Sequence, residues 1–188
     1  YFDQDNSIFL NTISNYRYGI AVTTAINTLG SPEGSSNEGT FIRDNVISSS
    51  SIVGIYLNAG DGQYSITGNG LVGNTIGISA KNSTGLKINY NNFQLNTTQL
   101  RAQSNNPESI LDATNNYWNL PNVQGAQDCA AIDAKILDKE DITEGQFVNF
   151  NPILEGPNPT GVSVDKCMPI LLVHGIYSND AMWDEGTV

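Results

Sequence analysis

The 188-residue sequence predicts an all-β protein, in which short parallel strands wind into a β-helix of about five rungs closed by a short helical cap. One observation is a recurring phrase, in which an apolar residue is followed by Asn three positions later and by another apolar residue two positions further on. The other is that apolar residues alternate over only a few positions before Gly, Asn or Ser interrupts them. Alternation is the period of a strand. A unit this small cannot bury its own apolar face, so stacked units must form the core together.

The repeated Asn residues set the length of the unit. They are followed by Gly-Ile in the first three copies, and a weaker fifth copy is centred on the last of them: Asn11, Asn45, Asn69, Asn91 and Asn115. Their spacings are 34, 24, 22 and 24 residues, and the long first interval contains the loop-like insertion "INTLGSPEGSS". Because Asn tolerates the left-handed backbone of tight corners, we expect these side chains to stack in a hydrogen-bonded ladder at one corner of the coil.

Residues 126–154 are predicted to cap the coil, which occupies residues 1–125. Asp128 can begin a short helix, and Cys129, Ile132 and Ile136 fall on one face of it. The stretch Phe147–Leu154 then reads as one more short strand. Six acidic residues between positions 128 and 144 are interpreted as a solvated surface and not as a metal site. Cys129 and Cys167 permit a disulfide without requiring one.

The repeat over residues 8–119 resembles the right-handed parallel β-helix repeat family, with its pectate-lyase-like and NosD-like members. "LDATNNYWN" is similar to the last segment of such domains, although Asn119 stands where they usually have Gly. The resemblance implies either a non-catalytic scaffold, surface or carbohydrate-binding module, or a polysaccharide lyase or glycoside hydrolase. Asp44, Asp61 and Asp112 do not recur at matching positions of the repeat, which favours the non-catalytic alternative. The NosD-like label also carries an association with copper, but no cluster of His, Met or Cys supports a copper site, so no cofactor is expected.

Composition restricts the partners. A formal net charge of -11 argues against nucleic acid, and no run of about eighteen apolar residues could span a membrane. Low charge with abundant Asn, Ser, Thr and Gly is typical of secreted β proteins, so we expect an extracellular or cell-surface monomer whose export signal lies outside this sequence. Its candidate ligand is a polysaccharide or cell-surface glycan, which tyrosines on the coil could stack against: Tyr16, Tyr18, Tyr56 and Tyr64.

The last residues predict a second kind of domain. Residues 155–166 are rich in Pro and Gly and are interpreted as a linker. Residues 167–188 contain "MPILLVHGI", and Pro169–Trp183 is similar to the start of lipase-like α/β-hydrolases. The resemblance implies that the Ile176 N–H belongs to an oxyanion hole, with His174 and Gly175 shaping the loop. The nucleophile, acid and base of that family are not present among these residues, so we expect the fragment itself to be non-catalytic and to precede an ester hydrolase domain.

Overall fold

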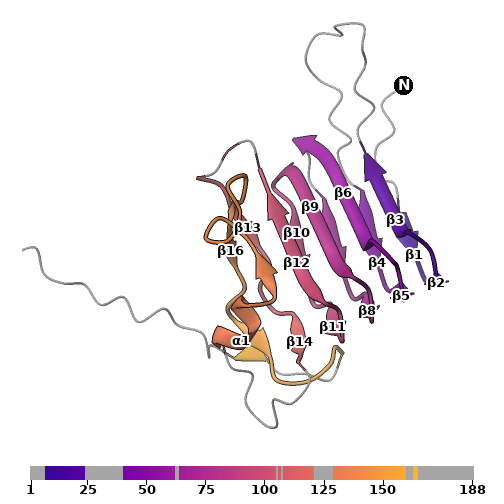
Figure 1. Cartoon of the computed structure of the whole chain (residues 1–188). Helices are drawn as coiled ribbons and strands as arrows, with labels where there is room; N and C mark the ends of the chain where they lie inside the picture. The colour runs from indigo at the N-terminus through magenta and orange to yellow at the C-terminus, as the bar shows by residue number, and fades with distance from the viewer. Residues whose placement is uncertain are drawn as a thin grey trace, which may run out of the picture.

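The computed structural model is a coil of parallel strands (Figure 1). It describes residues 7–23, 40–61, 64–104, 106, 108–120, 129–159 and 163–164. Consecutive strands enter three different sheets, and the fourth strand returns to pair with the first. This connection makes each group of three strands one turn of a parallel β-helix, which confirms the predicted fold class for the repeat. The predicted linker lies partly within the described residues, and the predicted hydrolase strand lies outside them.

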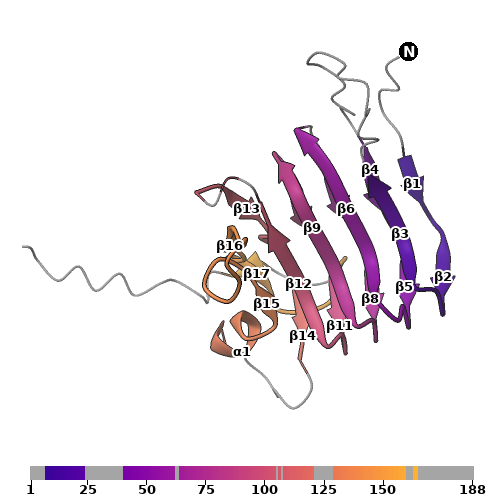
Figure 2. The same ribbon diagram turned by 45° about the horizontal axis from the view of Figure 1, so that its top comes forward.

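Each of the three sheets takes one strand from each turn. The first sheet contains β1 (Ser7–Phe9), β4 (Phe41–Arg43), β7 (Ser65–Thr67), β10 (Lys87–Asn89), β13 (Ile110–Asp112) and β16 (Phe147–Asn149). The second sheet contains β2 (Thr12–Ser14), β5 (Val46–Ser48), β8 (Gly70–Val72), β11 (Asn92–Gln94) and β14 (Tyr117–Asn119). The third sheet has the longer strands, which lie side by side in Figure 2: β3 (Tyr18–Thr23), β6 (Val53–Asp61), β9 (Ile76–Thr84), β12 (Thr98–Gln103) and the short β15 (Ile136–Leu137).

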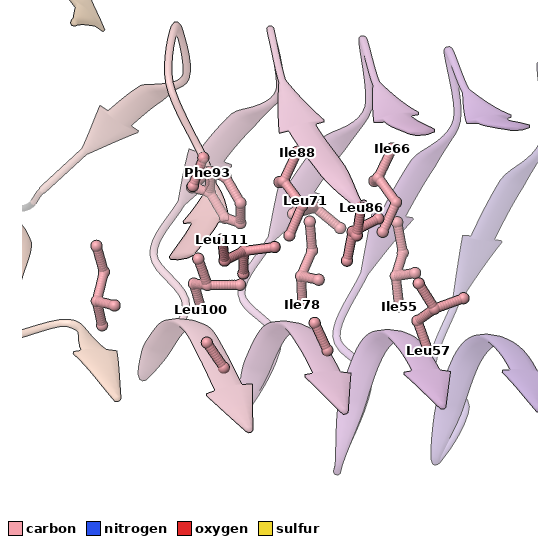
Figure 3. Close-up of a cluster of buried hydrophobic side chains, with 14 of the residues drawn as sticks. Ile55, Leu57, Ile66, Leu71, Ile78, Leu86, Ile88, Phe93, Leu100 and Leu111 are labelled. Carbon is pink, nitrogen blue, oxygen red and sulfur yellow. The ribbon is translucent and has the colours of Figure 1, made fainter. Parts of the chain in front are cut away.

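The core forms because like positions of the repeat fall in register. In the first sheet Ile42 pairs with Ile66, and Ile66 pairs with Ile88. Equivalent apolar columns run through the other two sheets, and their side chains point towards one another inside the coil (Figure 3). These side chains are at most 1% exposed. Near the C-terminal end of the coil, the apolar column of the second sheet has larger side chains, and Phe93 stacks on Trp118 with ring centroids 4.5 Å apart.

Left-handed residues make the corners between the sheets. At the corner between the first and second sheets they are Leu10, Asp44, Gly68, Tyr90 and Asn115. At the corner between the second and third sheets they are Asn15, Ser49, Gly73 and Leu95. Positive φ is costly for bulky side chains, so the repeated appearance of the same conformation in successive turns shows that stacking imposes it.

The C-terminal end differs from the predicted cap in one respect. The helix α1 (Cys129–Asp133) is only five residues long and buries Ile132. The prediction that Ile136 continues the helical face is wrong, because Ile136 lies in β15 and pairs with Leu100. There it extends the inward apolar column of the third sheet, which buries more apolar surface than an exposed helical turn would. The predicted strand Phe147–Leu154 is present only in part: its first three residues form β16, which pairs with β13, and its last two belong to a separate strand, β17 (Ile153–Leu154).

Part of the predicted linker folds back on the coil. Strand β17 (Ile153–Leu154) pairs antiparallel with β18 (Ser163–Val164), and the Leu154 N–H donates to the Asn116 carbonyl at 3.0 Å. Further along, the Asn158 N–H donates to Asn92 Oδ1 at 2.7 Å, and Asn92 Nδ2 donates to the Asn158 carbonyl at 3.0 Å. These bonds hold residues 153–158 against the second sheet.

Candidate functional site

An inward-facing column of Asn side chains lines the first corner. In each step, Oδ1 of one Asn accepts hydrogen bonds from the backbone N–H and from the Nδ2 group of the Asn one turn earlier. The distances are 2.8 to 3.1 Å, and the members are Asn11, Asn45, Asn69, Asn91 and Asn116. All but the first are fully buried. The column therefore provides hydrogen-bond partners for buried polar groups that would otherwise have none at this corner.

The fifth member is Asn116, and the prediction of Asn115 is wrong. Asn115 is the left-handed residue of its corner, with φ of 55°, and the column residue is always the one that follows the left-handed residue. Two adjacent Asn residues occur here, and the interval from Asn91 fits either of them to within one residue. Only the conformation of the corner distinguishes the two.

A second, shorter column lies at the corner between the second and third sheets. Asn74 uses its N–H and Nδ2 to bond Asn96 Oδ1 at 2.8 and 3.0 Å, and the Ser50 N–H bonds Asn74 Oδ1 at 2.9 Å. Gln99 ends this column by accepting from Asn96 Nδ2 at 2.7 Å. This column is not among the predictions from the sequence, although the interval from Asn74 to Asn96 equals the interval of 22 residues from Asn69 to Asn91.

The third sheet contains the two longest strands of the described residues, β6 and β9. Ile55 and Leu57 are fully buried, so Tyr56 between them points outward. The same alternation places two rows of side chains across the sheet. One row is Ala21, Tyr56, Ser79, Arg101 and Leu137. The other row is Thr23, Asn58, Lys81 and Gln103. We call these two rows the outer face.

Three of the four predicted binding tyrosines lie on or beside the outer face. Tyr18 is 43% exposed and meets the Tyr56 ring edge-on, with centroids 5.9 Å apart. Tyr16 is 63% exposed and precedes β3. The prediction for Tyr64 is wrong, because its ring packs into the apolar core and is only 2% exposed. Burial there raises the pKa of the Tyr64 hydroxyl.

Two of the carboxylates considered as catalytic candidates, Asp44 and Asp112, do not form a pair. Asp44 follows β4 and Asp112 lies in β13, which puts them three turns apart, about 14 Å along the coil at the usual strand spacing. Paired carboxylates of glycoside hydrolases lie about 5 to 10 Å apart. Partial burial raises the pKa of Asp112, but hydrogen bonds from Thr114 and Asn89, with the charge of Lys87, outweigh burial and lower it overall. A carboxyl group with a lowered pKa is poorly suited to act as a general acid.

These features define a repeat protein of the parallel β-helix class, held together by Asn columns. The chain belongs to the family described as periplasmic copper-binding protein (NosD), whose family model matches residues 1–127. No curated protein and no solved structure matches the chain. In the described part of the chain, the helix found is too short and too polar to cross a membrane.

The residues of this chain do not fit the copper site that the family description implies. Proteins bind copper through His, Met and Cys side chains, and residues 1–127 contain none of these. Cys129 is disulfide-bonded, which removes it as a thiolate ligand. The remaining Cys, Met and His residues lie outside the described residues: Cys167, Met168, His174 and Met182. The predicted oxyanion-hole residue Ile176 also lies outside them, with His174 and Gly175, which are predicted to shape its loop. Among the residues that the structure describes, no group of His, Cys, Asp or Glu is arranged to hold a metal ion.

Proposed function

We propose that the coil is a non-catalytic module that binds a polysaccharide or cell-surface glycan along its outer face. The observation that carries the proposal is the edge-to-face pair of Tyr18 and Tyr56 on the sheet with the longest strands. A tyrosine offers a rigid flat ring and a polar tip and loses little conformational entropy when it binds. Amide and hydroxyl groups on the same face, such as Asn58 and Gln103, can bond the hydroxyl groups of a sugar.

Binding to insoluble polysaccharides and to a glycan array tests this proposal. We expect the 188-residue protein to be retained by at least one glycan, and Tyr56→Ala and Tyr18→Ala to weaken retention about tenfold each. Tyr90→Ala is the matched control, since Tyr90 is 46% exposed but lies at the corner between the first and second sheets. Equal retention of all three variants and the unmodified protein would contradict the proposed face.

We further propose that the module positions a C-terminal ester hydrolase in the parent protein. The support is the similarity of Pro169–Trp183 to the first strand of lipase-like α/β-hydrolases, with Ile176 in the oxyanion-hole position. The bonds between Asn92 and Asn158 favour a fixed exit for the chain that leads to this region. Hydrolysis of a short-chain p-nitrophenyl ester by a protein extended beyond Val188, with loss of activity on replacing the Ser of a G-x-S-x-G motif, is the expected result. An extension without that motif would refute the hydrolase assignment.

A periplasmic or extracellular location is part of the same proposal. It is supported by the family description and by the disulfide of Cys129, since disulfides persist in oxidising compartments. Fractionation of cells that produce the natural protein tests it, and recovery in the reduced cytoplasmic fraction would contradict it.

A further inference from the structure

The two ends of the coil differ in how they are closed (Figure 2). At the C-terminal end, β16 adds a strand to the first sheet, and α1 buries Ile132 in the core. At the N-terminal end, β1, β2 and β3 are the outermost strands of the three sheets among the described residues. Inward residues of this first turn are half-buried, whereas their partners one turn later are at most 1% exposed; the pairs are Ile8 with Ile42 and Ile13 with Ile47. The described residues therefore leave the N-terminal end of the apolar core partly uncovered.

Backbone N–H groups of the first turn also lack acceptors. At the first corner, the residue after each column Asn donates its N–H to the carbonyl of the column Asn one turn earlier, at 2.8 or 2.9 Å; the donors are Val46, Gly70, Asn92 and Tyr117. Thr12 is the first-turn residue at this position, and its N–H bonds no described residue. At the second corner, the Arg17 N–H is likewise unbonded within the described residues, although the residues at its position in later turns donate to the turn before them: Ser51, Thr75 and Thr97. Such N–H groups mark an edge with which a further strand can pair.

The first Asn column has a polarity, and this polarity limits what can fill the open end. From the second member onward, each Oδ1 accepts from the N–H and Nδ2 of the Asn one turn earlier. Asn11 is the first member, so its Oδ1 has no donor among the described residues, while its own N–H and Nδ2 both bond Asn45 Oδ1. The N-terminal end of the column is therefore an acceptor that is matched by two N–H donors from one neighbouring residue.

A second copy of the chain does not supply these donors. If two copies met end to end about a two-fold axis, the same surface of each would face the other. The Asn11 Oδ1 atoms of the two columns would then meet as two acceptors, which cannot bond each other. The opposite end of another copy is already closed at this column, because the Asn116 carbonyl accepts from the Leu154 N–H at 3.0 Å. A turn of the same repeat, in contrast, presents an Asn whose N–H, Nδ2 and carbonyl all have the required places.

We propose that the N-terminal end of the coil is an interface for one further turn of the same repeat, which the parent protein supplies before Tyr1. An Asn in that turn donates its N–H and Nδ2 to Asn11 Oδ1, and its carbonyl accepts from the Thr12 N–H, as at each later step of the column. After the long first interval, successive column residues are 22 to 25 positions apart. This Asn is therefore expected 22 to 25 positions before Asn11, with an apolar residue two positions after it. Such a turn covers Ile8 and Ile13 and adds a strand to each sheet, and the inference is independent of the proposed glycan binding.

Amide hydrogen exchange followed by NMR tests the proposal on three proteins. The first is the 188-residue protein, and the second is lengthened at its N-terminus by one unit, 22 to 25 residues, of the natural sequence. In the third, a copy of residues 64–85 replaces residues 1–5, which continues the register because Ser7 and Lys87 occupy the same position of the repeat.

We expect the Thr12 and Arg17 amides to exchange at least about tenfold more slowly in the second and third proteins than in the first, because each gains a buried acceptor. The variant of the third protein with Asn69→Ala in the copy alone is the matched control. It keeps the added length but removes the Nδ2 donor to Asn11 Oδ1, so most of the protection should be lost. Circular dichroism checks that the coil is folded in each protein.

Several outcomes would overturn the proposal. One is unchanged exchange of both amides in the second protein, and another is a natural sequence without Asn at the expected positions. Slow exchange of these amides in the 188-residue protein itself would show that this end is already covered. Sedimentation would then assign the cover to a second copy if the protein is a dimer, or to the chain's own residues if it is a monomer, and either result excludes a preceding turn as the occupant. Glycan binding is measured separately on the array, so failure of one proposal leaves the other intact.

Discussion

Replacing Asn69 by Ala removes the central member of the first Asn column. The Asn69 side chain accepts from the Asn45 N–H and Nδ2 at 3.0 and 2.9 Å. Its own Nδ2 group donates to Asn91 Oδ1 at 3.0 Å and to two backbone carbonyls, those of Ile42 at 2.9 Å and Thr67 at 3.1 Å. All of these contacts would be lost together in Asn69→Ala.

The cost follows from which groups keep another partner. Asn45 Nδ2 keeps two backbone carbonyls, Asn91 Oδ1 keeps the Asn69 N–H, and the Thr67 carbonyl keeps the N–H of the preceding turn. The Asn45 N–H has no other acceptor among the described residues and would be left buried. One unsatisfied N–H costs about 1–3 kcal/mol and each lost bond about 0.5–1.5 kcal/mol. With partial relaxation, we expect a total of about 3 kcal/mol.

Asn11→Ala is the matched control at the exposed end of the column. Among the described residues its side chain makes two bonds, from Nδ2 to the Phe9 carbonyl and to Asn45 Oδ1, both at 3.0 Å, and water can replace them. We expect a loss within about 1 kcal/mol.

Urea unfolding followed by the fluorescence of the buried Trp118 gives both free energies of unfolding. Equal losses for Asn69→Ala and Asn11→Ala would refute the argument that burial within the column sets the cost.

Three further results are expected. Gln99→Gly restores the Gly of the earlier repeats but removes the acceptor of Asn96 Nδ2, so urea unfolding should show a loss of about 1 kcal/mol; a gain would contradict the role of Gln99 at the end of the second column. Gly54→Ala places a Cβ 2.7 Å from the carbonyl oxygen of the next turn, and it should lower the free energy of unfolding by about 1–3 kcal/mol, whereas an unchanged value would show that the strands can separate without cost. The lowered pKa of Asp112, set mainly by Thr114 against partial burial, stabilises the fold above the ordinary pKa of Asp. This contribution is lost as pH falls towards the lower folded value, so Asp112→Asn should flatten the acid limb of stability against pH, and an unchanged limb would contradict it.

The β-helix fold could be predicted from the sequence because the same pattern of Asn and apolar residues recurs in each turn. Asn45, Asn69 and Asn91 each follow an inward Ile and precede another inward apolar residue, and stacking requires the same residue at the same place in each turn. The second column was harder to detect, since Ser50 replaces Asn in one turn. Asn74 and Asn96 alone are too few to show a pattern against an Asn-rich background.

The residues of the outer face could not be predicted from the spacing of the repeat, because that spacing does not show which way each side chain points. Tyr64 was expected on the surface, but the residues before β7 turn it into the core. The neighbouring places of Lys81 and Arg101 follow from the register between two adjacent turns, in which paired residues are 22 positions apart, and an error of one residue would put one of them inside the coil. The direction of side chains at the ends of short strands therefore cannot be predicted from the spacing of the repeat alone.

The division between inward and outward positions explains why family membership says little about the ligand of this chain. The family match depends on the repeat, and the repeat is made of inward residues: the Asn columns and the apolar columns that stack on them. These residues fix the spacing of successive turns and the register of the sheets. Outward residues such as Tyr56, Lys81 and Arg101 make no contribution to that packing, so one coil can present different surfaces. The copper named in the family description calls for side chains that the matched residues do not contain, whereas the outer face has an aromatic pair and two cations without partners among the described residues. For this chain, ligand chemistry has to be inferred from the outer face.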